Sequence, residues 1–508
     1  MKKIGFFIIC TVFICSSCSN FEEININPNN PSTVPPEMLL SPIISGAVRS
    51  MTGSGSRAGQ YVQHLAWLGG TSEGDGRYNL TGASFREEWN VPMRLIKDVN
   101  RMKIIAKNNR QQEYEAVAII CKVYILSLMT DAYGDIPYAE AGMGDVSGME
   151  FSHYQSQSEV YSLMLEDLET ANDLLAALPV KTVINRDILY KGNPNAWRRF
   201  ANSLKIRILM RQSQKKDVSA DVAKIFSDPA KYPVFETNSD QATLEYNNNP
   251  DYYEWFMQNP PADGSGVNFE SNERVSDVMV NMLLKFNDPR LYIYAAPTGN
   301  SYRKHVSNSL HTLEYRGQTA GLSAMEQDEV YKNTGLNKDD YSVIGKRIRK
   351  ENRAFLMTCC ELLLLKTEAI HRKMIQGNAG ETYKAAVRAS FDKWQRVGQD
   401  SDETTPFISE EQKTAYFRPE TAYNPDKGLQ QIAEQQWIDS FLNGFEGWAS
   451  WRRTGYPSIK PGPSVLSPIP VRYVYSDNEQ NNPNLVKWVK ETTGGTMPDH
   501  NVKVWFQP

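Results

Sequence analysis

The sequence repeats apolar residues at three- and four-residue intervals along most of its length, and this spacing constrains the fold more than any other feature. Apolar residues at that interval line one face of an α-helix, which is then buried against other elements. The pattern extends over residues 37–51, 57–68, 84–107, 111–130, 156–177, 194–213, 353–375, 380–396 and 427–443. It predicts an all-α fold.

Helix ends within this series indicate that neighbouring helices pair. Asn193 and Pro194 mark a helix start, because asparagine caps a first turn and proline needs no N–H donor there. Asn378 and Gly380 leave only a short turn between the segments 353–375 and 380–396. Helices joined by so short a turn run antiparallel, so the sequence predicts antiparallel helix pairs.

Two regions lack this regular spacing. Between residues 228 and 350 few stretches are periodic, residues 246–261 are rich in Asn, Pro and aromatic residues, and 263–266 form a Gly/Ser turn. We expect a long irregular excursion with a few short strands there, and its aromatic content argues against disorder. The region after Gly455 contains seven prolines between Pro457 and Pro498. It is expected to wrap over the helical body.

The first residues have the three parts of a bacterial export signal. Lys2 and Lys3 precede an apolar run over 4–14, and small residues then lead to Cys18. Cleavage before Cys18 would leave an N-terminal cysteine for acylation, although Cys15 stands where such signals usually carry leucine. The alternative is an ordinary secretory signal followed by a chance cysteine. We predict a signal peptide over 1–17, a lipidated tether over 18–35 and one helical domain over 36–508.

Charge and cysteine content exclude several classes of protein. The chain of 508 residues has 55 Lys and Arg against 59 Asp and Glu, a net charge of -4, which favours neither a nucleic-acid partner nor an anionic membrane surface. Cleavage before Cys18 leaves Cys121, Cys359 and Cys360 in the body of the chain besides the acylated cysteine. They lie in apolar runs and are expected to be small buried hydrophobic residues rather than a disulfide framework.

Four segments are more specific together than any one alone. They are MTDAYGDIPYAEA at 129–141, PNAWRRFANSLKIR at 194–207, QQWIDSFLNGFEGW at 435–448 continuing into WRRTGYP at 451–457, and IPVRY at 469–473 with Glu479, Asn481 and Asn482 behind it. Periodicity suggests that most of these residues are structural. The aromatic stripe Trp437, Phe441, Phe445, Trp448 and Trp451, for example, is expected to pack in the core rather than form a sugar platform.

These segments resemble the SusD/RagB family of Bacteroidetes outer-membrane lipoproteins, in particular its SusD-like branch. The resemblance covers the whole mature chain in the family's order. It implies an all-α body of tetratricopeptide-like helix pairs with long irregular loops. It also implies a surface-exposed, non-catalytic protein that captures oligosaccharides, or peptides, and delivers them to a SusC-like TonB-dependent transporter in the outer membrane.

Ligand contacts in a helical scaffold are expected from aromatic residues in loops, where a ring can stack on the apolar face of a sugar. Two clusters meet this requirement. The first is Trp67 with Arg77 and Tyr78, around glycines 69, 70, 74 and 76. The second lies within the irregular excursion and consists of Tyr252, Tyr253, Trp255 and Phe256, with Asn268 after them. Packing of each loop on its own helices is the alternative for both clusters.

Catalytic motifs are not evident. The predicted helical domain over 36–508 has no His-Glu-x-x-His, Gly-x-Ser-x-Gly, Gly-Lys-Ser or Cys-x-x-Cys, and Glu368 with His371 is its single Glu-x-x-His within a predicted helix, where a di-iron bundle needs two. No cofactor is predicted; a structural calcium ion stays open as an alternative at the Asp/Asn loops near Asp263 or Asp477–Glu479, although neither has the spacing of a recognised site. Two other functions remain open: a cell-surface endo-acting glycoside hydrolase, and a helical assembly scaffold without a small ligand.

Overall fold

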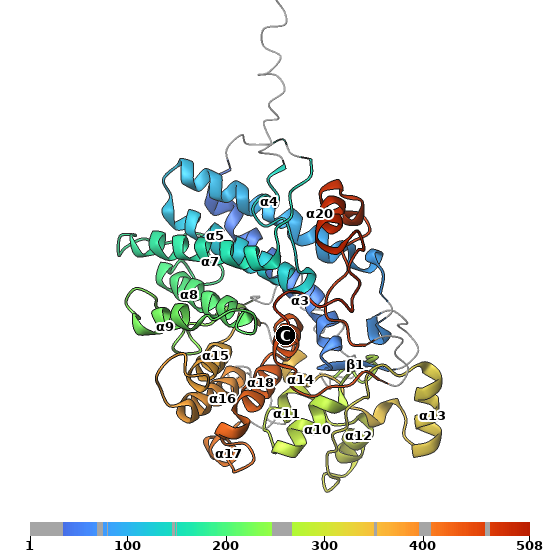
Figure 1. Cartoon of the computed structure of the whole chain (residues 1–508). Coiled ribbons are helices and arrows are strands. Elements are labelled where there is room, and N and C mark those ends of the chain that lie inside the picture. The colour runs from blue at the N-terminus through green and yellow to red at the C-terminus, as the bar shows by residue number, and fades with distance from the viewer. Residues whose placement is uncertain are drawn as a thin grey trace, which may run out of the picture.

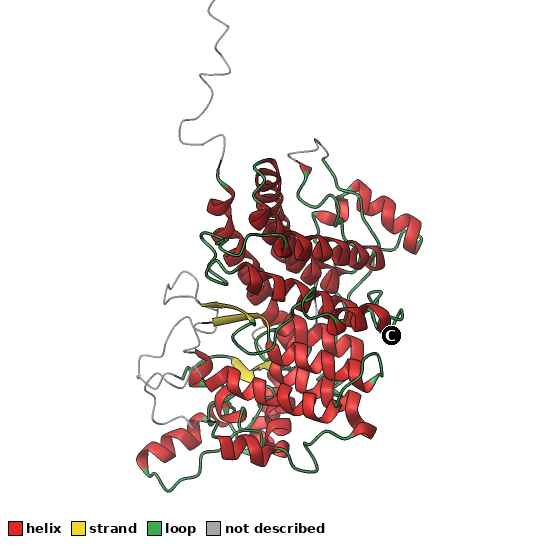
Figure 2. Ribbon diagram, turned by 90° about the vertical axis from the view of Figure 1, so that its left-hand side faces the viewer, coloured by secondary structure: helices red, strands yellow, loops and turns green. Residues whose placement is uncertain are grey.

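A computed structural model describes residues 34–68, 75–78, 80–144, 148, 150–245, 267–349, 353–395, 408–462 and 468–508. These residues form an all-α protein with two small sheets, as the periodicity predicts. Figure 2 shows the few strands in yellow among the helices. The predicted signal peptide and nearly all of the tether, including Cys18, lie outside the described residues.

The N-terminal half is a stack of helices that follow one another along one side of the molecule (Figure 1). Short turns join the first pair, α4 and α5, so these helices are antiparallel as expected. Contacts continue from α5 to α7 and from α7 to α8. The helices are α3 (Pro36–Tyr61), α4 (Arg86–Asn108), α5 (Gln112–Tyr133), α7 (Gln157–Ala176), α8 (Pro194–Arg211) and α9 (Ser219–Ser227).

The predicted start of α8 is confirmed. The Asn193 side chain accepts hydrogen bonds from the N–H groups of Asn195 and Ala196, and Pro194 occupies the first turn. The apolar face of α8 is buried, while its arginines bind acids or cap neighbouring carbonyl groups. Gly134, which ends α5, has φ +83°, a conformation that other residues adopt only with strain.

The middle region contains more helix than the sequence analysis predicts. Its short strands are present, but five helices replace the expected irregular excursion wherever the structure describes it. The region contains β2 (Ala242–Glu245), β3 (Glu273–Val275), α10 (Asp277–Phe286), α11 (Leu291–Tyr294), α12 (Gly299–Ser307), α13 (Ala324–Thr334), α14 (Lys346–Arg349) and the 3-10 turn η4 (Lys338–Asp340). Capping explains α13, because Ser323 and Glu326 bond reciprocally at its start and Gly335 ends it in the left-handed conformation.

Two predicted helix boundaries are wrong for a shared reason. Segments 37–51 and 57–68 merge into α3, which stops at Tyr61 before strand β1 (Leu65–Trp67). Segment 353–375 begins as strand β4 (Arg353–Met357), and Thr358 then caps α15 (Cys359–His371). In both segments, antiparallel pairing with a distant strand overrides the local helical spacing: β1 pairs with β3 and β4 pairs with β2.

The C-terminal third completes the body with a second group of paired helices. Helix α15 packs on α16 (Ala379–Gln395) and on α18 (Gly428–Asp439), and α17 (Glu410–Tyr416) lies between them in sequence. Asn443 starts α19 (Gly444–Thr454), which contacts α3 and so joins the two groups. The remaining 3-10 turns are η1 (Asp75–Arg77), η2 (Gly82–Phe85), η6 (Pro425–Lys427) and η7 (Glu479–Asn481).

The segment after Gly455 wraps over the helical body, as expected. The Tyr473 N–H donates to the Ala132 carbonyl at the end of α5, and the Trp448 indole donates to the Pro470 carbonyl. One correction is needed, because this region also contains helix α20 (Pro483–Thr493), started by Asn482 and Pro483. The same Asn-Pro signal identifies α8 in the sequence.

Helix α5 is long and apolar enough to cross a membrane, and it alone among the described residues passes that test. However, 94% of its most apolar window is buried inside the protein. Its neighbours α3, α4, α7 and α8 cover it. It is therefore the central core helix of the N-terminal group.

Candidate functional site

The short sheet β1–β3 joins Trp67 of the first predicted ligand cluster to the strand that follows Asn268 in the sequence. Trp67 is the last residue of β1 and lies opposite Glu273, the first residue of β3. Beyond that pair, the Leu68 N–H donates to the Asn272 carbonyl at 2.8 Å. Trp67 of the first cluster therefore lies at the end of this ladder, and Asn268 precedes Glu273 by five residues in the chain that enters β3. We call Trp67, Leu68 and residues 268–273 the β1–β3 rim.

Trp67 and Glu273 are the chemically distinctive pair of this rim. Residues directly opposite each other in an antiparallel ladder place their side chains on the same face, within about 5.5 Å at the Cβ atoms. The Trp67 side chain is partly exposed, whereas Glu273 is only 5% exposed. An aromatic ring beside a carboxyl group is a combination that can stack on a sugar ring and accept its hydroxyl hydrogen bonds.

The Glu273 carboxyl group has an unusual electrostatic environment. No hydrogen bond or ion pair joins it to any other side chain that the structure describes. Burial therefore raises its pKa from 4.5 to about 8, because nothing compensates the ionised form for lost hydration. Near neutral pH the group carries a proton and can donate as well as accept a hydrogen bond. Unpartnered buried carboxyl groups cluster at functional sites.

Arg274 holds the rim from the opposite face of the strand. Its guanidinium group is buried and donates to the carbonyl groups of Ser271, Glu273, Phe269 and Lys338. Burial, only partly offset by nearby acidic groups, lowers the Arg274 pKa to about 10. Beneath the turn, Phe269 packs on Tyr302 with ring centroids 5.6 Å apart. The backbone that leads into β3 is consequently fixed by several independent contacts.

The residues predicted around this rim differ in their exposure. Arg77, at the end of η1, and Asn268 are both partly exposed. Tyr78 is 1% exposed, with φ +61°, and its ring meets Tyr61 edge-on at 5.8 Å. Burial raises the pKa of Tyr78 to about 12. Its ring thus presents no open face in this structure and packs in the core instead.

Several predicted residues lie outside the described part of the chain. They are the lipidation residue Cys18 and the aromatic residues Tyr252, Tyr253, Trp255 and Phe256. Their assignments stay predictions. Sequence reasoning also missed Glu273, which lies in a stretch without motif or periodicity. The one local indication of Glu273 is the sequence Glu-Arg-Val of β3. In this short strand a carboxyl group occupies an inward-facing position.

The aromatic stripe in the signature region is structural, as predicted. Trp437, Phe441, Phe445 and Trp448 are buried, and Trp451 is partly buried. Trp448 stacks under the Arg452 guanidinium at 3.6 Å and contacts Tyr61 and Tyr473. The three cysteines of the body are buried as well. These residues build the junction between the two helix groups.

Two cavities elsewhere in the described residues lack the features of a glycan site. An enclosed cavity of about 40 Å³ lies between Phe355, Trp394, Asp439 and Glu446, which is room for about three water molecules. A larger open groove of about 570 Å³ is lined by Asn90, Arg94, Lys97, Glu150 and neighbouring glycines, without an aromatic ring among its lining residues. Within the described residues no group of three or more His, Cys, Asp or Glu side chains is arranged to hold a metal ion.

Comparison with solved structures shows which proteins share this architecture. A SusD homologue from Bacteroides fragilis superposes with a TM-score of 0.76 at 22% identity, covering 94% of this chain and 99% of its own. An outer-membrane protein of Bacteroides vulgatus assigned to nutrient binding gives a TM-score of 0.77 at 24% identity, covering 94% and 100%. A chitin-binding protein gives 0.76 at 22% identity, covering 93% and 100%.

Sequence comparison places the chain in a family. Among curated protein sequences there is no significant match. A family model described as "Starch-binding associating with outer membrane" matches residues 28–476, which is most of the chain and includes the β1–β3 rim. The chain therefore belongs to this SusD-like family of starch-binding proteins associated with the outer membrane.

Proposed function

We propose that this protein is a lipid-anchored, non-catalytic receptor on the outer surface of the outer membrane, which binds oligosaccharides at the β1–β3 rim and passes them to a SusC-like TonB-dependent transporter. Cys18 carries the lipid in this proposal. Membership of a starch-binding, outer-membrane family supports it, as does the likeness of the fold to a chitin-binding protein.

The pairing of Trp67 with Glu273 is the observation that carries the assignment of the site. It combines a partly exposed indole with a carboxyl group that no described protein group satisfies. A sugar hydroxyl group would supply the missing hydrogen-bond partner. One ring that covers 50–80 Å² of ligand contributes roughly 1–2 kcal/mol, so several rings and hydrogen bonds give micromolar to millimolar affinity after the cost of association.

The arrangement of the best-placed acids supports binding over hydrolysis. Glycoside hydrolysis needs two carboxyl groups about 5–10 Å apart on either side of the scissile bond. Glu361 and Glu446 lie close enough to share Arg207, but both are buried and bound by arginines beside a cavity that holds only water-sized molecules. Glu368 is likewise bound by Arg453 and Arg372, and His371 contacts the Tyr423 hydroxyl. Both side chains are therefore already engaged within the protein.

Isothermal titration against starch-derived and chitin-derived oligosaccharides, and against a peptide pool, tests the proposal. The full chain should give saturable heat with one glycan class and release no shorter product. Product formation that one Asp or Glu substitution abolishes would instead identify a hydrolase. Saturation by peptides alone would identify a peptide receptor. If substitution of the aromatic residues of the rim leaves the affinity unchanged and no other ligand is found, the protein would instead be a helical assembly scaffold without a small ligand.

A further inference from the structure

A second surface feature lies outside the β1–β3 rim. The loop between α7 and α8 carries exposed aliphatic side chains beside basic ones. Val180 is fully exposed, Val183 is 61% exposed and Ile188 is also exposed. Lys181 and Arg186 lie between them in sequence, and both are exposed. We call residues 178–188 the α7–α8 loop.

This loop is rigid in spite of its exposed apolar side chains. The buried Asp187 carboxylate accepts the N–H groups of Leu189, Tyr190 and Gly192 and the indole N–H of Trp197 at 2.8–3.0 Å. The Tyr114 hydroxyl bonds both the N–H and the carbonyl of Asn185. Apolar side chains held outward on a fixed backbone lose little conformational freedom when they are covered, which favours a docking role.

The loop also lies beside the point where the predicted lipid tether joins the body. The Ser41 hydroxyl in the second turn of α3 donates to the Arg186 carbonyl at 2.6 Å. Met38, one turn earlier in the same helix, has a side chain that is 45% exposed. Between Cys18 and Val34 the chain can span at most about 55 Å. A lipid on Cys18 would therefore hold the start of α3 within that distance of the membrane surface.

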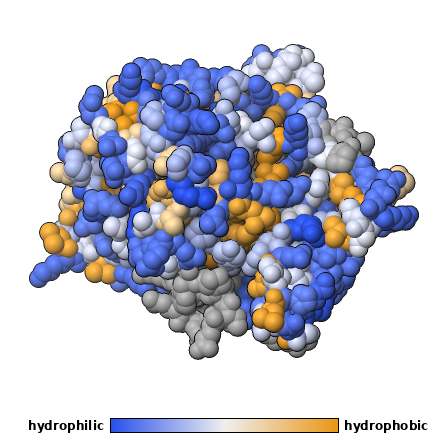
Figure 3. All heavy atoms as spheres, turned by 90° about the horizontal axis from the view of Figure 1, so that it is seen from below, coloured by the Kyte–Doolittle hydropathy of each residue, from blue (hydrophilic) through white to orange (hydrophobic). Residues whose placement is uncertain are grey.

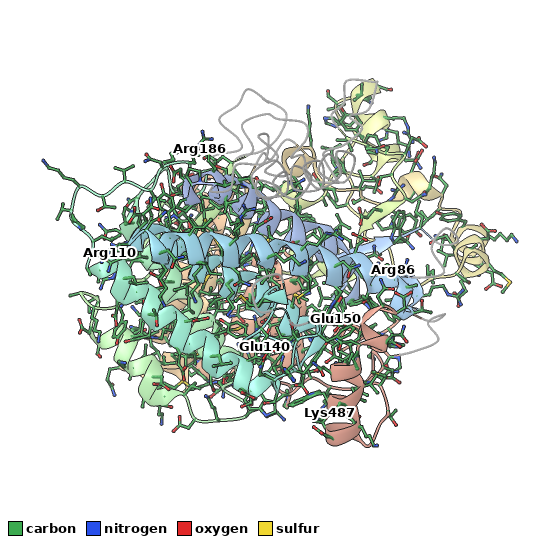
Figure 4. The ribbon with its side chains drawn as sticks, turned by 90° about the horizontal axis from the view of Figure 1, so that it is seen from above. Arg86, Arg110, Glu140, Glu150, Arg186 and Lys487 are labelled. Atoms are coloured by element: carbon green, nitrogen blue, oxygen red, sulfur yellow. The ribbon has the colours of Figure 1, made fainter. Side chains whose placement is uncertain are left out.

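Charge is distributed unevenly over this end of the molecule. Figure 4 places Arg110 and Arg186 toward one side of the face, whereas Glu140 and Glu150 lie toward its middle. Lys181 and Arg186 make no ion pair with any described residue, while Lys191 approaches Glu245 at 3.9 Å. The loop thus presents two basic side chains without a described ion pair, although Glu37 and Glu113 lie near its contact with Tyr114 and the whole chain has a net charge of -4. Each basic residue near an anionic membrane strengthens binding about fivefold.

We propose that the α7–α8 loop is a membrane-docking element, in which Val180, Val183 and Ile188 enter the lipid headgroup region and Lys181 and Arg186 contact anionic lipid phosphates. The proposal rests on the lipid anchor of the proposed function. Separate aliphatic tips beside basic residues fit a lipid interface. A standard protein interface takes about 20–30 residues from each partner, which is more than residues 178–188 comprise.

Site-specific fluorescence on the lipidated full-length protein tests this. The cysteines of the body are buried, so a thiol introduced by Val180→Cys can be labelled selectively with an environment-sensitive dye. Leu310→Cys is the matched control, because Leu310 is 90% exposed next to α12, at the opposite end of the molecule from α4 (Figure 1). Both proteins are reconstituted in phosphatidylcholine vesicles with or without phosphatidylglycerol.

We expect the dye at residue 180 to shift to shorter wavelength and to be quenched by lipid-borne quenchers, more strongly with phosphatidylglycerol, while the dye at 310 does neither. The double change Lys181→Glu and Arg186→Glu should reduce quenching at least fivefold. Equal, water-like emission at both positions would overturn the proposal. Protection at 180 only when a transporter protein is added would overturn it too. Glycan titration on the same vesicles reports the proposed function separately.

Discussion

Arg207 of α8 and Glu361 of α15 form a bidentate ion pair inside the protein, with Nε 2.5 Å from Oε1 and Nη2 2.6 Å from Oε2. The pair belongs to a chain of buried charges, in which Glu446 contacts Arg207 and Arg211 and Arg211 also contacts Asp131. It joins the N-terminal helix group to the C-terminal one. Two halves of the sequence that fold as separate stacks are thereby locked in one arrangement.

Arg207→Met should destabilise the protein by about 3–5 kcal/mol, because it leaves Glu361 buried beside only distant positive charge. Denaturant unfolding followed by circular dichroism measures this change. The matched control is Arg86→Met, which removes an ion pair with Asp477 on the surface. That substitution should leave the free energy of unfolding nearly unchanged, because solvent screens the exposed pair. Equal effects of the two changes would contradict the role assigned to the buried pair.

Trp67→Ala should weaken oligosaccharide binding about tenfold, because the contact area of one ring is lost. Isothermal titration provides the affinity, and thermal unfolding shows whether the variant remains folded. Tyr456→Ala is the control, since Tyr456 is an exposed aromatic residue remote in sequence from the rim. If both variants bind as the wild-type protein does, the β1–β3 rim is not the ligand site.

Glu273→Gln should make the protein more stable above neutral pH. The native pKa of about 8 exceeds the ordinary 4.5, so the native state binds the extra proton between these values and wild-type stability falls as pH rises through them. The fall amounts to about 2–4 kcal/mol. Gln keeps the shape without ionising, so the unfolding free energies of variant and wild type should diverge from pH 5 to pH 8.

The same substitution should weaken glycan binding, since an amide donates and accepts in a different geometry. A variant that is more stable and binds less well would indicate that Glu273 is kept for its function. A variant that binds normally and shows the wild-type pH dependence of stability would contradict both the burial and the role of this carboxyl group.

The contribution of His64 to stability has the opposite pH dependence to that of Glu273. Burial lowers its pKa from 6.5 to about 3, only partly offset by its contact with the Trp437 carbonyl at 2.9 Å. The unfolded chain therefore binds the proton first, and stability falls by about 2–4 kcal/mol as pH drops from 6.5 toward 3. His64→Gln retains a donor for that carbonyl group and should lose less stability on acidification. Thermal unfolding at a series of pH values compares the two proteins.

The sequence predicts the long helices well, because spacing and capping agree in them. Helix α8 shows this: Asn193, Pro194 and the buried Trp197 stand where the pattern requires. The short helices of the middle region were missed, since three turns or fewer give too little periodicity to recognise. Their caps, such as Ser323 with Glu326, were readable in the sequence.

The candidate site was only partly predictable. Trp67 and Asn268 stand out as an aromatic and an amide residue in loop-like sequence, yet nothing local indicates that they share a rim. Their proximity comes from the pairing of β1 with β3, which joins segments about 200 residues apart. Tyr78 shows the opposite case. Its glycine neighbours make it look like an exposed loop residue in the sequence, but its ring packs against Tyr61 in the structure. Such outcomes depend on tertiary packing rather than on local composition.

The buried thiols of Cys121, Cys359 and Cys360 have a chemical consequence under oxidising conditions. Burial raises the pKa of each thiol above its ordinary value, that of Cys359 to about 12. Only the thiolate form reacts readily with peroxide or with a disulfide. In this protein the raised pKa disfavours the thiolate, and burial shields the sulfur atom from reagents. These three thiols should therefore resist peroxide and mixed-disulfide formation even under oxidising conditions.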